Sequence, residues 1–376
     1  MDDSAPDALF RPVSVAIDRI LQVSQPFTIC HLLFTIYHLP PMHLAEEQKA
    51  EVLDSLPRTV ELLEAEISKI IIGQKETVRQ IVIGIACGGH CLLRGVPGLA
   101  KTLLVKTLAE ALDLRFNRIQ FTPDLMPSDI TGTDIIEEDR TTGHRAARFV
   151  RGPVFANIVL ADEINRAPPK TQAALLEAMQ EGQVTAGGVR FALEQPFFVL
   201  ATENPIEQEG TYHLPEAQLD RFLFEIEIGY PTAEDERRII SQTTGNRRDS
   251  VQRVLNASTM ILIQQVVRDV PAASNIIGYA SRLVRSTRPG TPEAAQFVNE
   301  NVRWGAGPRG GQALILGAKA RALIEGRFAV GFEDVRAMAY PVLRHRILPN
   351  FRAEAEGISS SNVISEILRL TKEDGP

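Results

Sequence analysis

The stretch GVPGLAKT, residues 95–102, stands between the apolar run CLLR and the helical pattern LLVKTLAEAL. Glycine and proline are typical of turns, so the stretch predicts a connection from a strand to a helix. Backbone N–H groups at the start of a helix also bind anions, which makes the same stretch a candidate phosphate-binding loop. Ala100 stands where the pattern G-x-x-x-x-G-K-[ST] has its second glycine. The loop alone therefore leaves both interpretations open.

Apolar runs that end in polar clusters recur along the first part of the chain and alternate with helical patterns. The clearest strand pattern lies in FANIVLADEINRA, residues 155–167, where the run IVLA ends in two acids. Residues 117–122 and 197–205 give two further strand patterns, and the amphipathic helix pattern TQAALLEAMQEG lies between them. This alternation is typical of an α/β domain with a parallel sheet, whose ligand lies at the carboxyl ends of the strands.

The patterning of the chain changes twice. Strand patterns become rare after Pro231, which predicts an α/β domain over residues 42–231 and a mostly helical domain over residues 232–376. Residues 1–41 resemble neither part. Their apolar run FTICHLLFTIYHLP is too short to span a bilayer comfortably, and it lacks the basic start of a signal peptide. We interpret residues 1–41 as an accessory or disordered extension.

The composition narrows the class of protein. With 44% hydrophobic and 23% charged residues, the chain is an ordinary soluble globular protein. Its net charge of −7 weighs against general nucleic-acid binding. The cysteines, Cys30, Cys87 and Cys91, form no disulfide framework and indicate a reducing compartment, so we expect a cytoplasmic protein. Cys87, His90 and Cys91 could be metal ligands, but the spacing favours small packing groups on either side of a glycine pair.

Binding and hydrolysis of a nucleoside triphosphate require more than a phosphate loop. Lys101 stands at the position from which a lysine reaches the β- and γ-phosphates. Thr102 and Asp162 supply the hydroxyl and the carboxylate that hold Mg²⁺. Glu163 follows, where a carboxylate could polarise the attacking water. An acidic pair at a strand end is often only a solvated turn, but the loop, the spacing and the acids together favour ATP with Mg²⁺.

Five blocks carry a resemblance to a known family. They are GVPGLAKT, GPVFANIVLADEINRAPPKTQAALLEAMQEGQVT, ATENPIEQEGTYHLPEAQLDRF, GAGPRGGQALILGAKARAL and EDVRAMAYPVLRHRI. In this order the blocks resemble the MoxR family of AAA+ ATPases over about residues 44–350. The resemblance implies an α/β P-loop AAA+ core, with a parallel sheet flanked by helices and β-hairpin inserts, followed by a C-terminal helical lid domain.

The resemblance also implies which residues bind the nucleotide. The form GxPGxAKT is usual in this family, so Ala100 is no obstacle. The loop residues that would hold the phosphates are Gly95, Val96, Pro97, Gly98, Leu99, Ala100, Lys101 and Thr102, together with Asp162. The turn that contains Gly73 and Gln74 matches the segment that packs near the adenine.

Three further residues match catalytic positions of the family. Asn204 matches the sensor that orients the lytic water, a role that suits an amide able to donate and accept at once; the alternative is a strand-ending turn. Arg221 matches the arginine finger that reaches the nucleotide of a neighbouring subunit; the alternative is an ion pair with Asp220 or Glu225. Arg309 matches the second sensor, which couples the γ-phosphate to the lid, and its alternative is a solvated loop charge.

Two hairpin patterns interrupt the α/β alternation. Residues 133–150 have two strand-like runs around Thr141-Thr142-Gly143, and residues 183–193 have two short runs around Gly187-Gly188. They match the helix-two insert and the pre-sensor hairpin of the branch that contains MoxR and magnesium chelatase. In such rings the hairpins face the pore or a partner. The alternative is that either hairpin merely caps the sheet.

The resemblance implies a hexameric ATPase that remodels or matures a protein client, often together with a von Willebrand A-type partner. A magnesium chelatase motor subunit is one alternative, although DEINRA and GPRGG fit MoxR better. A nucleic-acid motor or restriction subunit of the same superfamily is another, and the acidic charge weighs against it. We expect no nucleic acid and no integral membrane segment.

Overall fold

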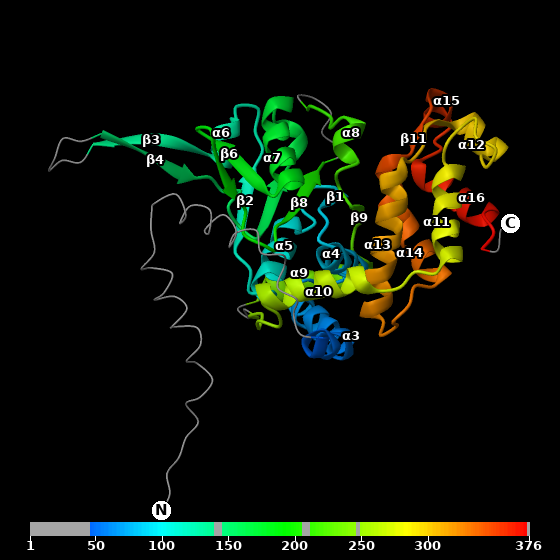
Figure 1. Ribbon diagram of the computed structural model, residues 1–376, viewed down its shortest axis with the longest axis horizontal. Coiled ribbons are helices and arrows are strands. Elements are labelled where there is room, and N and C mark those ends of the chain that lie inside the picture. The colour runs from blue at the N-terminus through cyan, green and yellow to red at the C-terminus, as the bar shows by residue number, and fades with distance from the viewer. Residues whose placement is uncertain (1–45, 139–144, 205–210, 246–248, 374–376) are drawn as a thin grey trace, which may run out of the picture. The chain divides into compact units, whose positions relative to one another are not determined.

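Five parallel strands form one sheet, as the alternating pattern predicts (Figure 1). The computed structural model describes residues 46–138, 145–204, 211–245 and 249–373. The predicted extension at residues 1–41 lies outside these ranges. The strands of the sheet are β1 (Cys91–Gly95), β2 (Phe116–Gln120), β5 (Ile158–Asp162), β8 (Phe198–Glu203) and β9 (Phe224–Ile228), and their order is β2–β5–β8–β1–β9.

Helices connect the strands and make up most of the chain that follows the sheet. In the described residues after Pro231 the exceptions are the short strands β10 (Val302–Trp304) and β11 (Leu348–Pro349), as expected for a fold that ends in helices. None of the described helices combines the length and the apolar content needed to cross a bilayer. The helices are α3 (Glu46–Ser68), α4 (Lys75–Ala86), α5 (Lys101–Ala111), α6 (Pro127–Thr131), α7 (Pro169–Glu181), α8 (Glu216–Leu219), α9 (Ala233–Thr243), α10 (Ala257–Asp269), α11 (Ser274–Ser286), α12 (Gln296–Asn301), α13 (Pro308–Ile324), α14 (Phe332–Leu343), α15 (Phe351–Ala355) and α16 (Ser360–Leu370).

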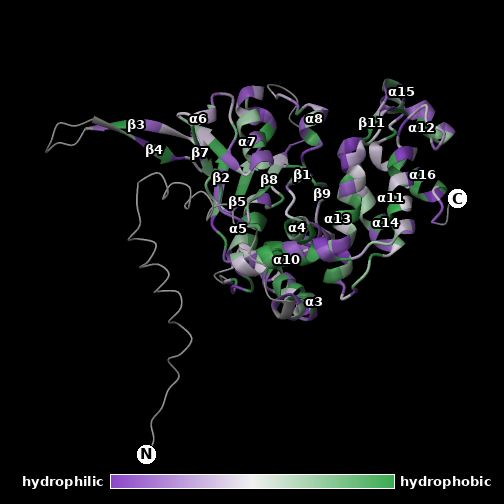
Figure 2. Cartoon of the chain, in the orientation of Figure 1, coloured by the Kyte–Doolittle hydropathy of each residue, from purple (hydrophilic) through white to green (hydrophobic). Residues whose placement is uncertain are grey.

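Helices cover both faces of the sheet. On one face, Leu92 of β1 lies in a buried cluster with Leu175 of α7. On the other face, Gly84 of α4 approaches β1 so closely that an added Cβ would stand 2.6 Å from Sγ of Cys91. The strand β5 is buried at every position, and the hydrophobic colour follows the central strands in Figure 2. Because both faces are covered, these strands read as continuous apolar runs rather than as an alternation.

Two antiparallel hairpins project from this α/β layer, which confirms the hairpin inserts. The first consists of β3 (Gly132–Glu138) and β4 (Arg145–Arg151), and its tip at residues 141–143 lies outside the described residues. The second consists of β6 (Gln183–Ala186) and β7 (Val189–Ala192). Its turn residues, Gly187 and Gly188, have φ values of +55° and +79°, as a tight turn requires. Phe149 stacks on Phe191 with ring centroids 4.3 Å apart, so the two hairpins support each other.

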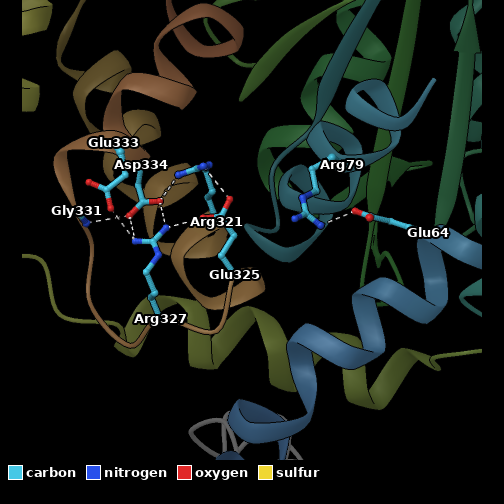
Figure 3. Close-up of polar contacts among 8 residues, drawn as sticks. All are labelled: Glu64, Arg79, Arg321, Glu325, Arg327, Gly331, Glu333 and Asp334. Atoms are coloured by element: carbon cyan, nitrogen blue, oxygen red, sulfur yellow. Dashed lines mark hydrogen bonds and ion pairs between the residues drawn. The ribbon is translucent and has the colours of Figure 1, made fainter. Parts of the chain in front are cut away.

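A buried carboxylate fixes the corner between α13 and α14 (Figure 3). Asp334 is fully buried and accepts hydrogen bonds from Arg327 at 2.6 Å and from the backbone N–H of Gly331 at 2.8 Å, and Arg321 donates to it as well. Burial by itself would raise the pKa of Asp334, but these donors, Arg327 foremost, lower it. The corner sets the direction of α14 relative to α13.

Figure 3 also shows Arg79 of α4 paired with Glu64 of α3 at 2.8 Å.

Cys87, His90 and Cys91, which were considered as metal ligands, are buried in the interior of the protein. The backbone N–H of Val199 donates to Nδ1 of His90 at 3.1 Å, so the ring proton lies on Nε2, which donates to the carbonyl of Met179 at 3.1 Å. Both ring nitrogens are thus occupied, and burial lowers the pKa of His90 to about 4. Burial also raises the pKa of the Cys87 and Cys91 thiols. These contacts support the packing interpretation of His90 and the two cysteines.

The buried neutral imidazole of His90 predicts a dependence of stability on pH. The folded pKa of about 4 lies below the unfolded value of about 6.5, so unfolding takes up a proton in the range between them. This contribution is complete above pH 6.5 and is lost as the pH falls towards 4. We expect His90 to lower the free energy of unfolding by about 2 kcal/mol between pH 7.5 and pH 5.

Urea denaturation of the wild type and of His90→Asn across this pH range measures the effect. Asn keeps an acceptor near the position of Nδ1, so the variant should be less stable at pH 7.5 but lose less stability on acidification. His345, which is also buried with a lowered pKa, contributes equally to both proteins. Equal pH slopes for the two proteins would contradict the assignment.

Candidate functional site

The predicted phosphate loop lies between the end of β1 and the start of α5. Gly95 is required by packing, because an added Cβ would stand 2.7 Å from the carbonyl oxygen of Ile228. Gly98 and Ala100 have φ values of +84° and +55°. Ala100 thus adopts the left-handed conformation in which a glycine is expected, and it precedes α5 without a side-chain cap. The first N–H groups of α5 are therefore open to an anion.

Lys101 begins α5 and points back across the loop. Its Nζ donates to the carbonyl of Gly95 and, at 3.5 Å, to the carbonyl of Glu203 at the end of β8. Burial lowers the pKa of Lys101, and the nearby charges of Asp162 and Glu163 act in the opposite direction. A half-buried ammonium group whose partners among the described residues are carbonyl oxygens can exchange them for phosphate oxygens.

Asp162, at the end of β5, faces the loop. Thr202 on the neighbouring strand donates to Oδ1 of Asp162 at 2.6 Å, and Arg118 on β2 donates to Oδ2 at 2.8 Å. The hydroxyl of Thr102 lies 3.4 Å from the same Oδ2. A hydroxyl and a carboxylate this close form an oxygen donor set of the kind that Mg²⁺ prefers, so the residues present fit the ion.

Glu163 lies beside Asp162 but points to different partners. Its backbone has a φ of +55°, and its N–H donates to the Thr202 hydroxyl at 2.8 Å. Gln120 at the end of β2 donates to Oε2 of Glu163 at 2.8 Å, and Arg166 pairs with the same oxygen at 2.9 Å. The left-handed residue turns the chain sharply after β5, so that the two acids diverge from one strand end.

The remaining residues predicted at the nucleotide lie on the same side. Asn204 follows β8, which pairs with both β1 and β5, and its side chain is buried. Gln74 donates to the carbonyl of Leu99 in the loop at 3.2 Å, which ties the predicted adenine segment to the phosphate loop. Gly73, with a φ of +78°, lies against Asp235 of α9.

Arg221 and Arg309 lie beyond the amino ends of the strands, on the side of the sheet opposite to the phosphate loop. The strands β1 and β9 are parallel with Cys91 opposite Phe224 and Gly95 opposite Ile228. Arg221 precedes the amino end of β9, whereas the phosphate loop follows the carboxyl end of β1. Four residue steps at the rise of a strand separate these edges by about 13 Å, so Arg221 does not reach the loop of its own chain.

The contacts of the two arginines differ from the alternatives set out above. Within the described parts of the chain, Arg221 donates to Gln180 and to the carbonyl of Leu176, both on α7, and pairs with neither Asp220 nor Glu225. Arg309 lies in the first turn of α13, and its guanidinium stands 3.7 Å from Oδ2 of Asp220. Both arginines line a cavity of about 1100 Å³ at this edge.

Three residues at the site escaped the sequence analysis. Thr202 binds both acids, and the only signal for it is a hydroxyl within the apolar run FFVLAT. Arg118 and Gln120 lie on β2 two residues apart, so both point to the same face of this edge strand, where they reach Asp162 and Glu163. Polar residues that alternate at the end of an edge strand were the available signal.

The chain is similar to known ATPases over most of its length. A family model described as "ATPase family associated with various cellular activities (AAA)" matches residues 90–224, and an AAA lid domain model matches residues 294–367. Chaperone MoxR1 of Mycobacterium tuberculosis is 42% identical over 329 residues, which are 88% of this chain and 86% of that protein. Protein MoxR of Paracoccus denitrificans is 34% identical over 306 residues, 76% of this chain and 87% of that protein.

A solved structure agrees with these sequence matches. The crystal structure of a Cytophaga hutchinsonii protein assigned as an ATPase superposes with a TM-score of 0.80 at 42% sequence identity. The match covers 87% of this chain and 98% of that one, so the sheet and the C-terminal helices are both included.

The contacts of Thr202 predict a measurable loss of stability. Thr202→Val would leave Oδ1 of Asp162 and the N–H of Glu163 without their buried partner, which costs about 1–3 kcal/mol. Thr202→Ser keeps the hydroxyl and is the matched control. Chemical denaturation of the three proteins measures the difference. A Val variant as stable as the Ser variant would show that water or another group replaces the hydroxyl.

Proposed function

This chain belongs to the MoxR family of AAA+ ATPases and hydrolyses ATP, and from this premise we propose that it works as a ring in which each ATP site is completed by the next subunit. The observation that carries the proposal is the separation of Arg221 from Lys101 by the length of the sheet. An arginine that cannot reach its own nucleotide is suited to the nucleotide of a neighbour. Such a head-to-tail contact closes into a ring by rotation, and we propose six subunits.

The nucleotide-binding edge supports a division of roles. Lys101 and the N–H groups at the start of α5 would hold the β- and γ-phosphates, with Gly73 and Gln74 beside the adenine. Thr102 and Asp162 would hold Mg²⁺, which neutralises charge on the phosphate oxygens when it is bound. Glu163 would accept a proton from the attacking water.

Two further groups would complete the reaction. Asn204, buried beside the loop and the acids, would orient the water through its amide. The guanidinium groups of Arg221 and Arg309 from the adjacent subunit would stabilise charge that develops on the transferred phosphoryl group.

We propose that hydrolysis drives the remodelling or maturation of a protein client in the cytoplasm. The support is the relative named Chaperone MoxR1, together with two hairpins that project from the α/β layer and offer contact surfaces. A von Willebrand A-type partner belongs to the same proposal. A magnesium chelatase motor and a nucleic-acid motor are not favoured, because three relatives that match 88%, 76% and 83% of this chain carry MoxR names.

Lys101 and Glu163 predict two different defects at the same site. Lys101→Ala removes the charge at the phosphates, so we expect the affinity for a slowly hydrolysed ATP analogue to be nearly lost. Glu163→Gln keeps the size and hydrogen bonding but cannot act as a base, so ATP should bind and persist. Isothermal titration and the ATPase rate separate the two effects. Unchanged affinity in Lys101→Ala, or wild-type turnover in Glu163→Gln, would remove that residue from the proposed mechanism.

Arg221 predicts complementation between subunits. Arg221→Ala should bind ATP normally but hydrolyse it on the order of 10³-fold more slowly, as for other arginine fingers. Lys101→Ala keeps its finger but lacks a working ATP site. Mixing the two should restore part of the activity, because an intact ATP site then meets an intact finger across one interface.

The measurement is the ATPase rate against the mixing ratio, after subunit exchange has been verified. A curve with a maximum at intermediate ratios supports the shared site. Activity that stays at background in verified mixed rings would show that Arg221 has only a structural role, through its contacts with α7.

A further inference from the structure

Arg346, in the run LRHRI that follows α14, has no place in the mechanism above, yet it is 6% exposed and fully engaged. Its Nε donates to Oδ1 of Asp220 at 2.8 Å. Its two terminal nitrogens donate to the carbonyls of Phe222 at 2.8 Å and Leu223 at 3.2 Å. One guanidinium group therefore holds most of the segment 220–223, which we call the finger segment because it contains Arg221.

His345, the preceding residue, holds the same segment. Its Nε2 lies 3.1 Å from the carbonyl of Phe222, so this nitrogen carries the proton and donates. Burial, and then the charge of Arg346, lower the pKa of His345, so the ring is neutral. Two consecutive side chains from the C-terminal helices thus bind one carbonyl of the finger segment.

The chemistry of arginine explains why this residue type occupies the position. A buried charge is costly unless it is paired and hydrogen-bonded, and Asp220 supplies the charge partner at 2.8 Å. The planar fork offers donors in fixed directions, whereas the ammonium group of a lysine is a point charge on a flexible stem. The guanidinium of an arginine can therefore reach several acceptors spread over residues 220–223, whereas the ammonium group of a lysine cannot.

Asp220 also connects the two candidate trans-acting residues. Its Oδ1 accepts from Arg346, and its Oδ2 lies 3.7 Å from the guanidinium of Arg309. Arg221 is the next residue along the chain. The orientation of Asp220 therefore affects Arg309 directly and Arg221 through the backbone.

We propose that Arg346, with His345, is a positioning residue that sets the direction of Arg221 and Arg309 towards the neighbouring ATP site. This inference rests on the proposed function of Arg221. Because Arg346 follows α14, a movement of the C-terminal helices moves the finger segment with it. The hydrogen bonds that span the two regions thus connect the position of these helices to hydrolysis in the next subunit.

The test begins with Arg346→Lys, which keeps the charge but loses the fork. We expect the ATPase rate to fall on the order of 10²-fold, the scale of a misplacement of about 1 Å at a reacting group. The affinity for the ATP analogue and the mass of the ring by light scattering should be unchanged. Arg346→Met, which also removes the charge, is the second variant should Arg346→Lys prove too unstable to assay.

Arg344→Lys is the matched control. Arg344 belongs to the same run, but it contacts Glu227 at 3.3 Å and Ser361 at 3.2 Å and does not bind the finger segment. Its substitution should leave the ATPase rate close to that of the wild type. A comparable loss in Arg344→Lys would indicate a general disturbance of this run and would overturn the assignment to Arg346.

Mixing experiments separate a positioning role from a merely structural one. Arg346→Lys mixed with Lys101→Ala should regain activity, because the finger of the Lys101→Ala subunit serves the intact ATP site. The double variant Lys101→Ala with Arg346→Lys should fail to rescue Arg221→Ala, whereas Lys101→Ala alone should succeed.

The outcomes distinguish this inference from the proposed function. If Lys101→Ala and Arg221→Ala do not complement each other, the shared ATP site is wrong. If they do, but Arg346→Lys rings hydrolyse ATP at the wild-type rate or lose affinity for ATP at their own site, only the positioning role is overturned.

Discussion

The parallel direction of the five strands is the constraint on which the site depends. Since the strands run the same way, the segments that follow β1, β5 and β8 all meet at one edge. Lys101, Asp162 and Asn204 become neighbours for this reason, although they are far apart in the sequence. For the same reason Arg221, which precedes β9, lies at the opposite ends of the strands. The parallel topology therefore both assembles the proposed nucleotide site and separates Arg221 from it.

Left-handed backbone at non-glycine residues is concentrated at the proposed nucleotide site. Among the described residues, the non-glycine residues with positive φ are Ala100, Asp113 and Glu163. Two of these three lie at the site, where each such conformation costs about 1–3 kcal/mol. Ala100 opens the first N–H groups of α5, and Glu163 turns its side chain away from that of Asp162. At Glu163 the strained backbone is held by Thr202, whose hydroxyl accepts from the N–H of Glu163 and donates to Asp162.

The sequence was sufficient for features that depend on neighbouring residues. The strand ends, the loop and the acid pair were predictable because a buried strand, a turn and a helix start each have a local pattern. Thr202 and Gln120 were not, because their roles depend on which strand lies beside β5. The role of Arg346 was still harder to predict, because its partner Asp220 lies 126 positions away in the sequence. A run such as LRHRI shows only that charges are present, and the fold determines what they hold.

The pairing of β1 with β9 constrains the position of the finger segment. An added Cβ on Gly95 would stand 2.7 Å from the carbonyl of Ile228, so the strands are in close contact beside the phosphate loop. Their register from Cys91 to Gly95 is continuous, and the sheet therefore fixes the distance between the two edges within one subunit. The finger segment precedes the paired residues of β9, and the N–H of Leu223 still donates to the carbonyl of His90, just before β1, at 2.7 Å. The other acceptors of the segment are bound by side chains from outside the sheet, and two of these, His345 and Arg346, follow α14.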